Sequence, residues 1–322
     1  MSSNTPLASK THRGSIMIED ARIVEHQTHP GGQYILRLHA PKCAARAQPG
    51  QFVHLQCDPE LLMRRPFSIM RASAAQGWID IFYKFLGQGT RLLARRTPDE
   101  ILSVMGPIGE PFKPRSERPR ALLLGGGVGM PPMIFLAEYL RRNSDFMPLA
   151  MLGSELPFPF KPRPSRLMAS GMPDGVIAAM PLLDDWGIPS RLTSLQGFAG
   201  CFDGLITQLA TIWIEALRTA ERAKVEIFAC GPPGMLKAVA TLARAYGLPA
   251  QVSLEEYMAC AVGGCAGCTV EVQTEKGPAM KRVCVDGPVF DAQAVFPASD
   301  TAVQSAPDPG LAGRDGPVDL VG

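Results

Sequence analysis

The sequence predicts a β barrel plus α/β architecture: an antiparallel barrel, a parallel-sheet α/β domain and a small C-terminal cysteine domain. Over the first third, short apolar stretches alternate with turn signals, as in closed antiparallel barrels. Farther on, strands alternate with helices, which is typical of a parallel sheet. Half of the eight cysteines then fall within residues 260–284. A length of 322 residues allows two or three domains with separate cores.

Composition excludes several classes of protein. Hydrophobic residues make up 46% and charged residues 19%, with a net charge of +2, so nothing suggests nucleic acid or an anionic membrane as partner. The polar N-terminus has no apolar core, so no signal peptide is predicted. Residues 121–140 are long and nearly uncharged, but four glycines and two adjacent prolines favour strand, loop and helix over a membrane span. We expect a cytoplasmic protein, in which clustered cysteines usually serve metal or redox chemistry.

The barrel is predicted over residues 15–115, after a flexible arm at residues 1–14. Its strands are expected in six stretches: SIMIEDARIVEH, QYILRLHA, QFVHLQC, PFSIMRA, GWIDIFYKFLG and EILSVMG. The segment KPRSERP (113–119) is polar and proline-bearing, which is typical of a linker.

The α/β domain is predicted over residues 116–252. Its strands are expected at RALLLGG, PLAMLGS and VEIFACG, and its helices at MIFLAEYLRR and MLKAVATLARAYG. Residues 153–175 are proline-laden and predict an irregular excursion from this domain. The cysteine domain follows at 253–296. The last stretch, 297–322, is rich in Pro, Gly, Asp and Ala and predicts a disordered tail.

The cysteine spacing carries the strongest chemical signal in the chain. Cys260, Cys265, Cys268 and Cys284 follow the pattern C-x4-C-x2-C-x15-C, which matches the plant-type spacing for a [2Fe–2S] cluster. Glycines in the loop let backbone N–H groups turn toward sulfur, and we expect the fourth thiolate on a separate strand. A four-cysteine zinc site and a chance cluster of buried cysteines are the alternatives. Zinc ribbons favour paired CxxC knuckles, and only one occurs here.

The other cysteines are expected to be ordinary core residues or, in one case, ambiguous. Cys43, Cys57 and Cys201 lie in unrelated segments, which favours small buried apolar roles. Cys230 ends a predicted strand, so its thiol either packs in the core or faces a bound nicotinamide.

Two barrel motifs suit a phosphate-bearing ligand. Arg65, beside the rigid Pro66 in RRPFSI, could pair with a pyrophosphate in a bidentate manner. In YKFLGQGT, Gly87 and Gly89 allow close backbone approach, Thr90 could cap, and the predicted helix TRLLARR would present its N-terminus. Each motif alone is also explained by an edge strand or a simple turn.

Two glycine-rich turns of the α/β domain suit a dinucleotide. GGGVGMPP (125–132) lies between a buried strand and a helix, at the edge where parallel sheets bind ligands. Met130 occupies the third glycine position of G-x-G-x-x-G, so the Rossmann fingerprint is incomplete, while the prolines suit the first turn of a helix. CGPPGM (230–235) repeats the strand, tight turn and helix pattern. We therefore expect a Rossmann-like nucleotide domain.

In combination and order, RRPFSI, YKFLGQGT, MGPIG, GGGVGMPP, CGPPGM and SLEEYMAC-x4-C-x2-C…CVDGPVF resemble the ferredoxin-reductase-like superfamily. More closely, they resemble the electron-transfer subunits of class 1B dihydroorotate dehydrogenases, over roughly residues 15–296. The resemblance implies an FAD-binding barrel, an NAD(H)-binding α/β domain, and a [2Fe–2S] cluster that exchanges electrons with a separate FMN-containing catalytic subunit.

The resemblance also implies the roles of individual residues. FAD would be lined by Arg65, Pro66, Phe67 and Ser68, with Ser68 near the flavin ring, and its pyrophosphate would be held by Gly87, Gly89 and Thr90. The nicotinamide dinucleotide would be received by Gly126, Gly127, Gly129, Cys230, Gly231 and Pro232. FAD would exchange a hydride with the nicotinamide and single electrons with the cluster, without a side-chain acid or base.

Three departures from the family pattern and two rival functions remain. Ala261 replaces the usual glycine after the first cluster cysteine, which leaves the ligands intact. Gln196 stands where an acidic residue is expected and the 153–175 excursion is enlarged, and these two differences leave the NADH or NADPH preference open. The same module could serve a hydrogenase or a ferredoxin:NADP oxidoreductase complex. A non-enzymatic zinc-binding protein is the rival of another class.

Overall fold

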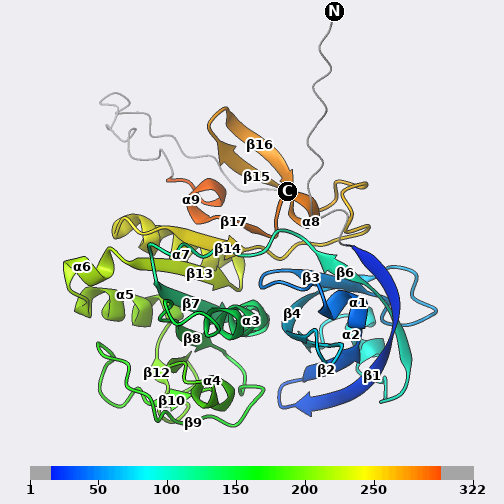
Figure 1. The fold of residues 1–322 in the computed structure, drawn as a ribbon, viewed down its shortest axis with the longest axis horizontal. Coiled ribbons are helices and arrows are strands. Elements are labelled where there is room, and N and C mark those ends of the chain that lie inside the picture. The colour runs from blue at the N-terminus through cyan, green and yellow to red at the C-terminus, as the bar shows by residue number, and fades with distance from the viewer. Residues whose placement is uncertain (1–15, 299–322) are drawn as a thin grey trace, which may run out of the picture.

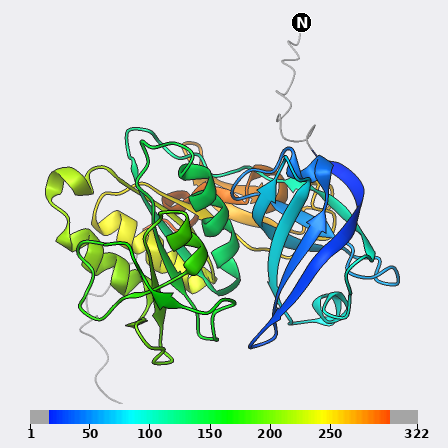
Figure 2. The same ribbon diagram turned by 60° about the horizontal axis from the view of Figure 1, so that its bottom comes forward.

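The computed structural model describes residues 16–298, which form a barrel, an α/β domain and a C-terminal segment (Figure 1). The predicted arm lies outside these residues, as does all but the first two residues of the predicted tail. The barrel and the α/β domain stand side by side, and the C-terminal segment spans their junction in both views (Figures 1 and 2).

Six antiparallel strands close the barrel in the order β1-β2-β5-β4-β3-β6, with β6 pairing back to β1. Inward-facing residues of β1, such as Ala21 and Ile23, are fully buried and alternate with exposed neighbours, which is the period-two pattern of a half-buried strand. The predicted antiparallel barrel is confirmed. The strands are β1 (Met17–His29), β2 (Gln33–His39), β3 (Phe52–Leu55), β4 (Arg65–Ser73), β5 (Trp78–Lys84) and β6 (Ile101–Ile108).

Two short helices lie in the connections between barrel strands: α1 (Pro41–Ala44) between β2 and β3, and α2 (Gln88–Leu93) between β5 and β6. The predicted start of the second helix at Thr90 is wrong, because Gly87 is the N-cap and helical geometry begins at Gln88. The Thr90 hydroxyl therefore does not occupy the N-cap position. It reaches back from the third helical residue, and the Gly87 N–H donates to it at 3.1 Å.

The α/β domain contains a seven-stranded sheet in the order β12-β11-β8-β7-β13-β14-β17. Neighbouring strands are parallel except for β17, which runs antiparallel to β14. The central strands β7 and β13 are buried along almost their whole length, as expected for a sheet covered on both faces. The strands are β7 (Arg120–Gly126), β8 (Leu149–Gly153), β11 (Ser190–Ser194), β12 (Phe202–Asp203), β13 (Val225–Cys230), β14 (Ala250–Ser253) and β17 (Val289–Asp291).

Helices cover the two faces of this sheet. Successive residues of β7, such as Leu122 and Leu123, point to opposite faces of the sheet and belong to different cores. One core contains α5 (Ile206–Ala216) and α7 (Pro233–Ala245), and the other contains α3 (Met130–Leu140) and α4 (Pro181–Asp185). Phe135 of α3 packs into the barrel core, so this helix joins the two domains. The short η2 (Gly127–Gly129) precedes α3, and α6 (Thr219–Arg222) precedes β13.

The proline-laden excursion is fastened near its start and near its middle. Near its start, Gln33 of the barrel donates to the Pro157 carbonyl at 2.7 Å. Near its middle, β9 (Arg163–Pro164) pairs with β10 (Ala178–Ala179). The buried Asp184 carboxylate accepts from the Ser165 hydroxyl at 2.7 Å and from the Arg166 N–H at 3.1 Å, which fixes the fold of a segment poor in regular structure.

The C-terminal segment returns to the sheet after forming its own hairpin. It comprises the cysteine loop, β15 (Thr269–Thr274), β16 (Gly277–Arg282), α8 (Val283–Asp286), β17 and α9 (Ala292–Val295). The barrel end also contacts it, because the Glu110 N–H donates to the Gly287 carbonyl. The segment is therefore attached to both domains. No helix among residues 16–298 is long and apolar enough to cross a membrane.

Candidate functional site

A cavity of about 840 Å³ lies where the barrel, the α/β domain and the C-terminal segment meet. This volume is within the range of small-molecule and cofactor sites. Among the residues that line it are Phe52, Arg65, Pro66, Phe67, Ser68, Tyr83 and Thr90 of the barrel; Val128, Pro233 and Ser253 of the α/β domain; and Glu255, Met258, Ala259, Gly267 and Pro288 of the C-terminal segment.

The barrel side brings the two predicted flavin motifs together. A Cβ at Gly89 would lie 3.1 Å from Cγ of Arg65, so the glycine loop packs directly on the Arg65 side chain. A Cβ at Gly87 would have no atom within 4 Å, so this backbone faces open space. Arg64 is committed elsewhere, since its guanidinium donates to Ser103 Oγ and to the Ser103 carbonyl. Arg65 is therefore the arginine of RRPFSI that is available to a ligand in the cavity.

A buried aromatic cluster that the sequence analysis did not identify supports this wall. Tyr83 lines the cavity, and its ring stacks on Tyr34 with centroids 5.1 Å apart. Its hydroxyl lies 2.8 Å from Nε2 of His26, and burial raises the pKa of Tyr83 well above the ordinary range. The edge of Phe67 packs against the same ring, with centroids 5.6 Å apart. The wall is thus rigid and apolar, as suits a planar ring.

The predicted nucleotide turns converge at the carboxyl edge of the sheet. Cys230 at the end of β13 is in register with Gly125 of β7 and with Ser253 of β14. A Cβ at Gly129 would lie 2.3 Å from the carbonyl carbon and oxygen of Cys230, so only glycine permits this approach. Gly127 adopts a φ of +55° and faces open space, which leaves room for a ligand beside the turn. Gly231 and Gly126 also approach closely, with the Met235 side chain beside both.

Glu255 is a functional candidate that the sequence analysis missed. The Cys230 thiol lies 3.9 Å from Glu255 Oε1 at the wall of the cavity. Burial raises the pKa of the Glu255 carboxyl, and burial together with the Glu255 charge raises the pKa of the Cys230 thiol. The sequence feature that could have identified Glu255 is its position two residues after β14, the strand that pairs with β13 and Cys230.

The four cysteines lie together as two pairs. The Cys265 N–H donates to Cys260 Sγ at 3.4 Å, and the side chains of Cys268 and Cys284 interact with each other. Burial opposes ionisation of Cys260, yet backbone N–H groups of Val262, Cys265 and Gly264 lower its pKa to about 7. Burial, followed by the Cys268 thiol, raises the pKa of Cys284 to about 12.

This pairing bears on which metal group fits. Two thiol pairs suit two irons, each of which takes two thiolates, and inward N–H groups suit a cluster whose sulfurs accept hydrogen bonds. The prediction that Cys284 comes from a strand is wrong, because it lies in α8, directly after β16. The short helix turns the thiol inward, where it is buried.

The loop backbone at Ala261 shows why the family usually has glycine at this position. Ala261 is buried and adopts a φ of +57°, a left-handed conformation that favours glycine. The side chain of Arg282 donates to the Gly263 carbonyl at 2.8 Å and fastens the loop to the end of β16. Cys265 is exposed, whereas Cys268 and Cys284 are buried, so one side of the loop faces solvent.

His54 is a second residue that the sequence analysis did not identify. It lies in β3 opposite Pro66, is 1% exposed, and has no hydrogen-bond partner at either ring nitrogen. Burial, aided by the Arg64 charge, lowers its pKa to about 4. The backbone of Met258 lies beside the ring without forming a well-aligned hydrogen bond. A neutral histidine therefore lies beside both Pro66 of β4 and Met258 of the cysteine segment.

Comparisons with known proteins agree with this geometry. Residues 255–296 match the family model described as the iron–sulfur cluster binding domain of dihydroorotate dehydrogenase B. Two relatives named dihydroorotate dehydrogenase B (NAD(+)), electron transfer subunit, come from Geobacillus thermodenitrificans and Bacillus caldolyticus. The first is 36% identical over an alignment that covers 80% of this chain and 91% of the relative. The second is 34% identical over an alignment that covers 87% of this chain and 97% of the relative.

Solved structures show the same fold. The chain resembles one reported for an NADH-dependent reduced ferredoxin-NADP oxidoreductase, with a TM-score of 0.68, 26% identity, and coverage of 85% of this chain and 89% of that chain. A ferredoxin NADP+ reductase from Neisseria gonorrhoeae, solved with bound FAD and NADP, gives a TM-score of 0.52 at 14% identity, covering 71% and 92%.

Fold and site together define an electron-transfer subunit of an oxidoreductase with a ferredoxin-reductase-like fold. The sequence identity and coverage of the two relatives show to which family within this class the chain belongs. The chain belongs to the family of electron transfer subunits of dihydroorotate dehydrogenase B.

Proposed function

We propose that this chain passes electrons between NAD(H), FAD and a [2Fe–2S] cluster, to or from the FMN-containing catalytic subunit of a dihydroorotate dehydrogenase in pyrimidine biosynthesis. The observation that carries the proposal is the single cavity bounded by the flavin motif, the glycine turns and the cysteine loop. Bound FAD supplies hydride exchange with nicotinamide and single-electron exchange with the cluster. The protein's part is to place the three groups next to one another.

On the barrel side, Arg65, Gly87 and Gly89 hold the FAD pyrophosphate, and Thr90 stabilises the loop that carries them. Arg65 lines the cavity and packs on Gly89, while the Thr90 hydroxyl accepts hydrogen bonds from the backbone of Leu86 and Gly87. Pro66, Phe67 and Ser68 then face the flavin ring from β4. Phe67 is held by Tyr83, so this wall keeps the ring in one plane.

On the α/β side, Gly126, Gly127, Gly129, Gly231 and Pro232 receive the nicotinamide dinucleotide at the end of the strand that carries Cys230, whose thiol is buried beside Glu255. The close approach of Gly129 to Cys230 brings the two turns together at the sheet edge. Burial raises the pKa of the Glu255 carboxyl, which lies beside Cys230 at the wall of the cavity.

The cysteine loop provides the route to the partner. Ala259 and Gly267 line the cavity directly beside the cluster ligands Cys260 and Cys268. Cys265, whose sulfur accepts a hydrogen bond from the Gly267 N–H at 3.4 Å, is exposed to solvent. A cluster in this loop therefore neighbours the flavin cavity and also lies close to the surface, as required for transfer between subunits. We place this activity in the cytoplasm, where thiols stay reduced.

The test is reconstitution with a partner. The chain is purified anaerobically, loaded with FAD and cluster, and combined with an FMN-containing dihydroorotate dehydrogenase catalytic subunit from the same cells. We expect orotate formation coupled to NAD reduction only when both subunits are present. Activity with an artificial electron acceptor but none with NAD would contradict the proposal.

The structural resemblance favours one second candidate. Because the fold matches that reported for an NADH-dependent reduced ferredoxin-NADP oxidoreductase, the same module could serve such a complex or a hydrogenase. Affinity purification from the native cells distinguishes these, since the proteins recovered with the chain identify its partner. Metal analysis tests the zinc alternative, which requires zinc in place of iron and no bound flavin.

A further inference from the structure

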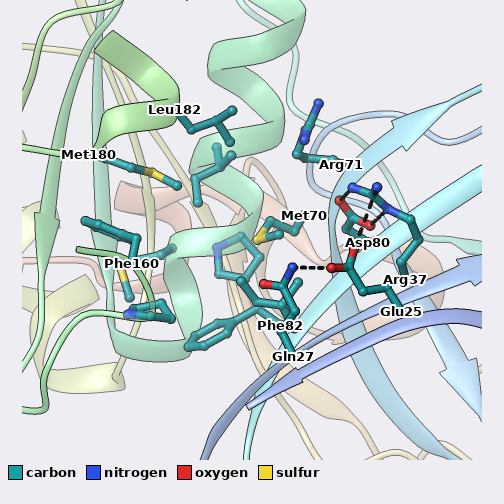
Figure 3. Close-up of a pocket in the computed structure, with 15 residues that line it drawn as sticks. Glu25, Gln27, Arg37, Met70, Arg71, Asp80, Phe82, Phe160, Met180 and Leu182 are labelled. Carbon is teal, nitrogen blue, oxygen red and sulfur yellow. Dashed lines mark hydrogen bonds and ion pairs between the residues drawn. The ribbon is translucent and has the colours of Figure 1, made fainter. Parts of the chain in front are cut away.

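A second, smaller cavity of about 230 Å³ separates the outer wall of the barrel from the α/β domain. Figure 3 shows Arg37, Arg71 and Asp80 on the barrel side and Met180 and Leu182 on the other side. The domains are in contact around this cavity, because Met70 and Phe82 of the barrel share a buried core with Met130 and Ile134 of α3. The polar and aromatic contacts that cross the boundary beside the cavity add to this packing and help to fix how the domains are oriented.

Next to this cavity, cationic and indole side chains alternate across the domain boundary. Arg37 lies over the Trp78 ring at 4.1 Å, and Arg71 lies over the same ring at 5.2 Å. Arg71 also lies 5.0 Å from the Trp186 ring, and Arg141 lies 5.1 Å from that ring. Arg37, Trp78 and Arg71 belong to the barrel, whereas Trp186 and Arg141 end helices of the α/β domain. Arg71 is the member that joins the two halves.

Arg71 also forms an ion pair across the boundary. Its Nη2 lies 3.4 Å from Glu138 Oε1 on α3. The Arg71 side chain is 21% exposed and the Glu138 side chain 13%, so solvent screens this pair less than a surface pair. Arg37, by contrast, is held within the barrel by a bidentate pair with Asp80 at 2.7 and 2.8 Å.

The two elements joined by this pair are those that carry the cofactor motifs. Strand β4 begins with Arg65 to Ser68, which line the large cavity, and continues to Arg71. Helix α3 follows directly from the Gly127–Gly129 turn and continues to Glu138. A movement of α3 relative to β4 would therefore change the distance between the flavin wall and the nicotinamide turn.

We propose that Arg71 is a positioning residue for hydride transfer, which fixes the nicotinamide turn relative to the flavin wall through Glu138 and Trp186. This inference rests on the proposed function. Hydride transfer requires reacting atoms about 3–3.5 Å apart, and a displacement of about 1 Å can cost roughly 10²-fold in rate. Electron transfer from flavin to cluster tolerates such a shift, and the cysteine loop does not take part in the Arg71 contacts.

The test compares Arg71→Gln, Glu138→Gln and the double variant with Arg222→Gln. Arg222 lies over the Tyr246 ring at 5.5 Å within the α/β domain, so the control removes a similar contact that does not cross the boundary. Anaerobic stopped-flow mixing with NADH gives the limiting rate of flavin reduction and the Kd for NADH. Photoreduction of the flavin, followed by the cluster signal, measures the second step separately.

We expect Arg71→Gln to lower the limiting rate of flavin reduction about ten- to hundredfold. The Kd for NADH, the FAD content and the photoreduced cluster signal should stay within twofold of wild type. The double variant should be no slower than the slower single variant, and Arg222→Gln should match wild type. An unchanged rate in Arg71→Gln would overturn the inference, as would an equal loss in Arg222→Gln or a parallel loss of FAD. If NADH does not reduce the wild-type flavin, the proposed function itself is wrong.

Discussion

Replacing Gly129 with alanine tests whether the two glycine turns must touch for hydride exchange. The added Cβ would lie 2.3 Å from the carbonyl carbon and oxygen of Cys230 and 2.5 Å from the Gly231 nitrogen. All three are backbone atoms, so no side-chain rotation relieves the contact. Gly129 has a φ of −84°, which alanine adopts freely, so the substitution introduces a steric clash without backbone strain.

The magnitude follows from the distance that must be gained. Ordinary carbon contacts begin near about 3.5 Å, so the Gly129 turn and the end of β13 must separate by roughly 1 Å. Overpacking of this kind costs about 1–3 kcal/mol of folding stability. Because the same turn receives the nicotinamide, we expect the limiting rate of flavin reduction by NADH to fall roughly 10²-fold.

The assay measures urea unfolding and anaerobic flavin reduction by NADH in Gly129→Ala, with Gly234→Ala as the matched control. Gly234 lies in α7, after the second turn, and a Cβ there would meet no atom within 4 Å. The control should therefore keep wild-type stability and rate, with FAD bound normally in both variants. A Gly129→Ala protein that reduces its flavin at the wild-type rate would refute the placement of the nicotinamide at this edge.

Three further predictions concern charge, metal binding and the excursion. The pKa of His54 is about 4 in the folded chain and 6.5 in the unfolded chain, so the unfolded chain binds more protons between these values. Stability therefore falls by about 1.4 kcal/mol per pH unit as the pH drops through this window. Urea titrations from pH 7 to 5 should show this slope in the wild type and not in His54→Leu, and equal slopes would contradict the prediction. Cys284→Ser should lose most of its iron and sulfide while keeping FAD, whereas Cys201→Ser should keep all three; full iron content in the first variant would exclude Cys284 as a ligand. Asp184→Asn should lower the free energy of unfolding by about 1–3 kcal/mol and speed proteolysis within residues 153–175, because the buried carboxylate that holds this segment is lost. Unchanged cleavage would show that Asp184 does not hold the segment.

The elements that sequence alone predicted have strong local signals. The barrel strands are short apolar stretches separated by turn residues, and β7 and β13 are mostly apolar runs, so local sequence identifies them without tertiary information. The cysteine spacing is similarly local, because a single loop carries three of the four thiols. The strands β9, β10 and β12 were not predicted, since two residues are too few to show any period.

The residues that sequence did not identify owe their importance to contacts between distant segments. Glu255 matters because β14, which ends two residues before it, pairs with the Cys230 strand, and His54 because the backbone of Met258 lies beside its ring. Arg71 follows the RRPFSI motif in β4 and becomes significant only when α3 packs against it. The start of α2 was placed two residues late because glycine caps it, and a glycine N-cap gives no side-chain signal.

If one cavity brings nicotinamide, flavin and cluster into electronic contact within this chain, NADH alone should reduce both groups. An anaerobic NADH titration of the purified subunit, followed by absorbance and by electron paramagnetic resonance, measures this. We expect NADH to bleach the flavin absorbance, and the signal of a reduced [2Fe–2S] cluster then to appear without any partner present. A reduced flavin with no cluster signal at any NADH concentration, in protein shown to contain iron and sulfide, would contradict it.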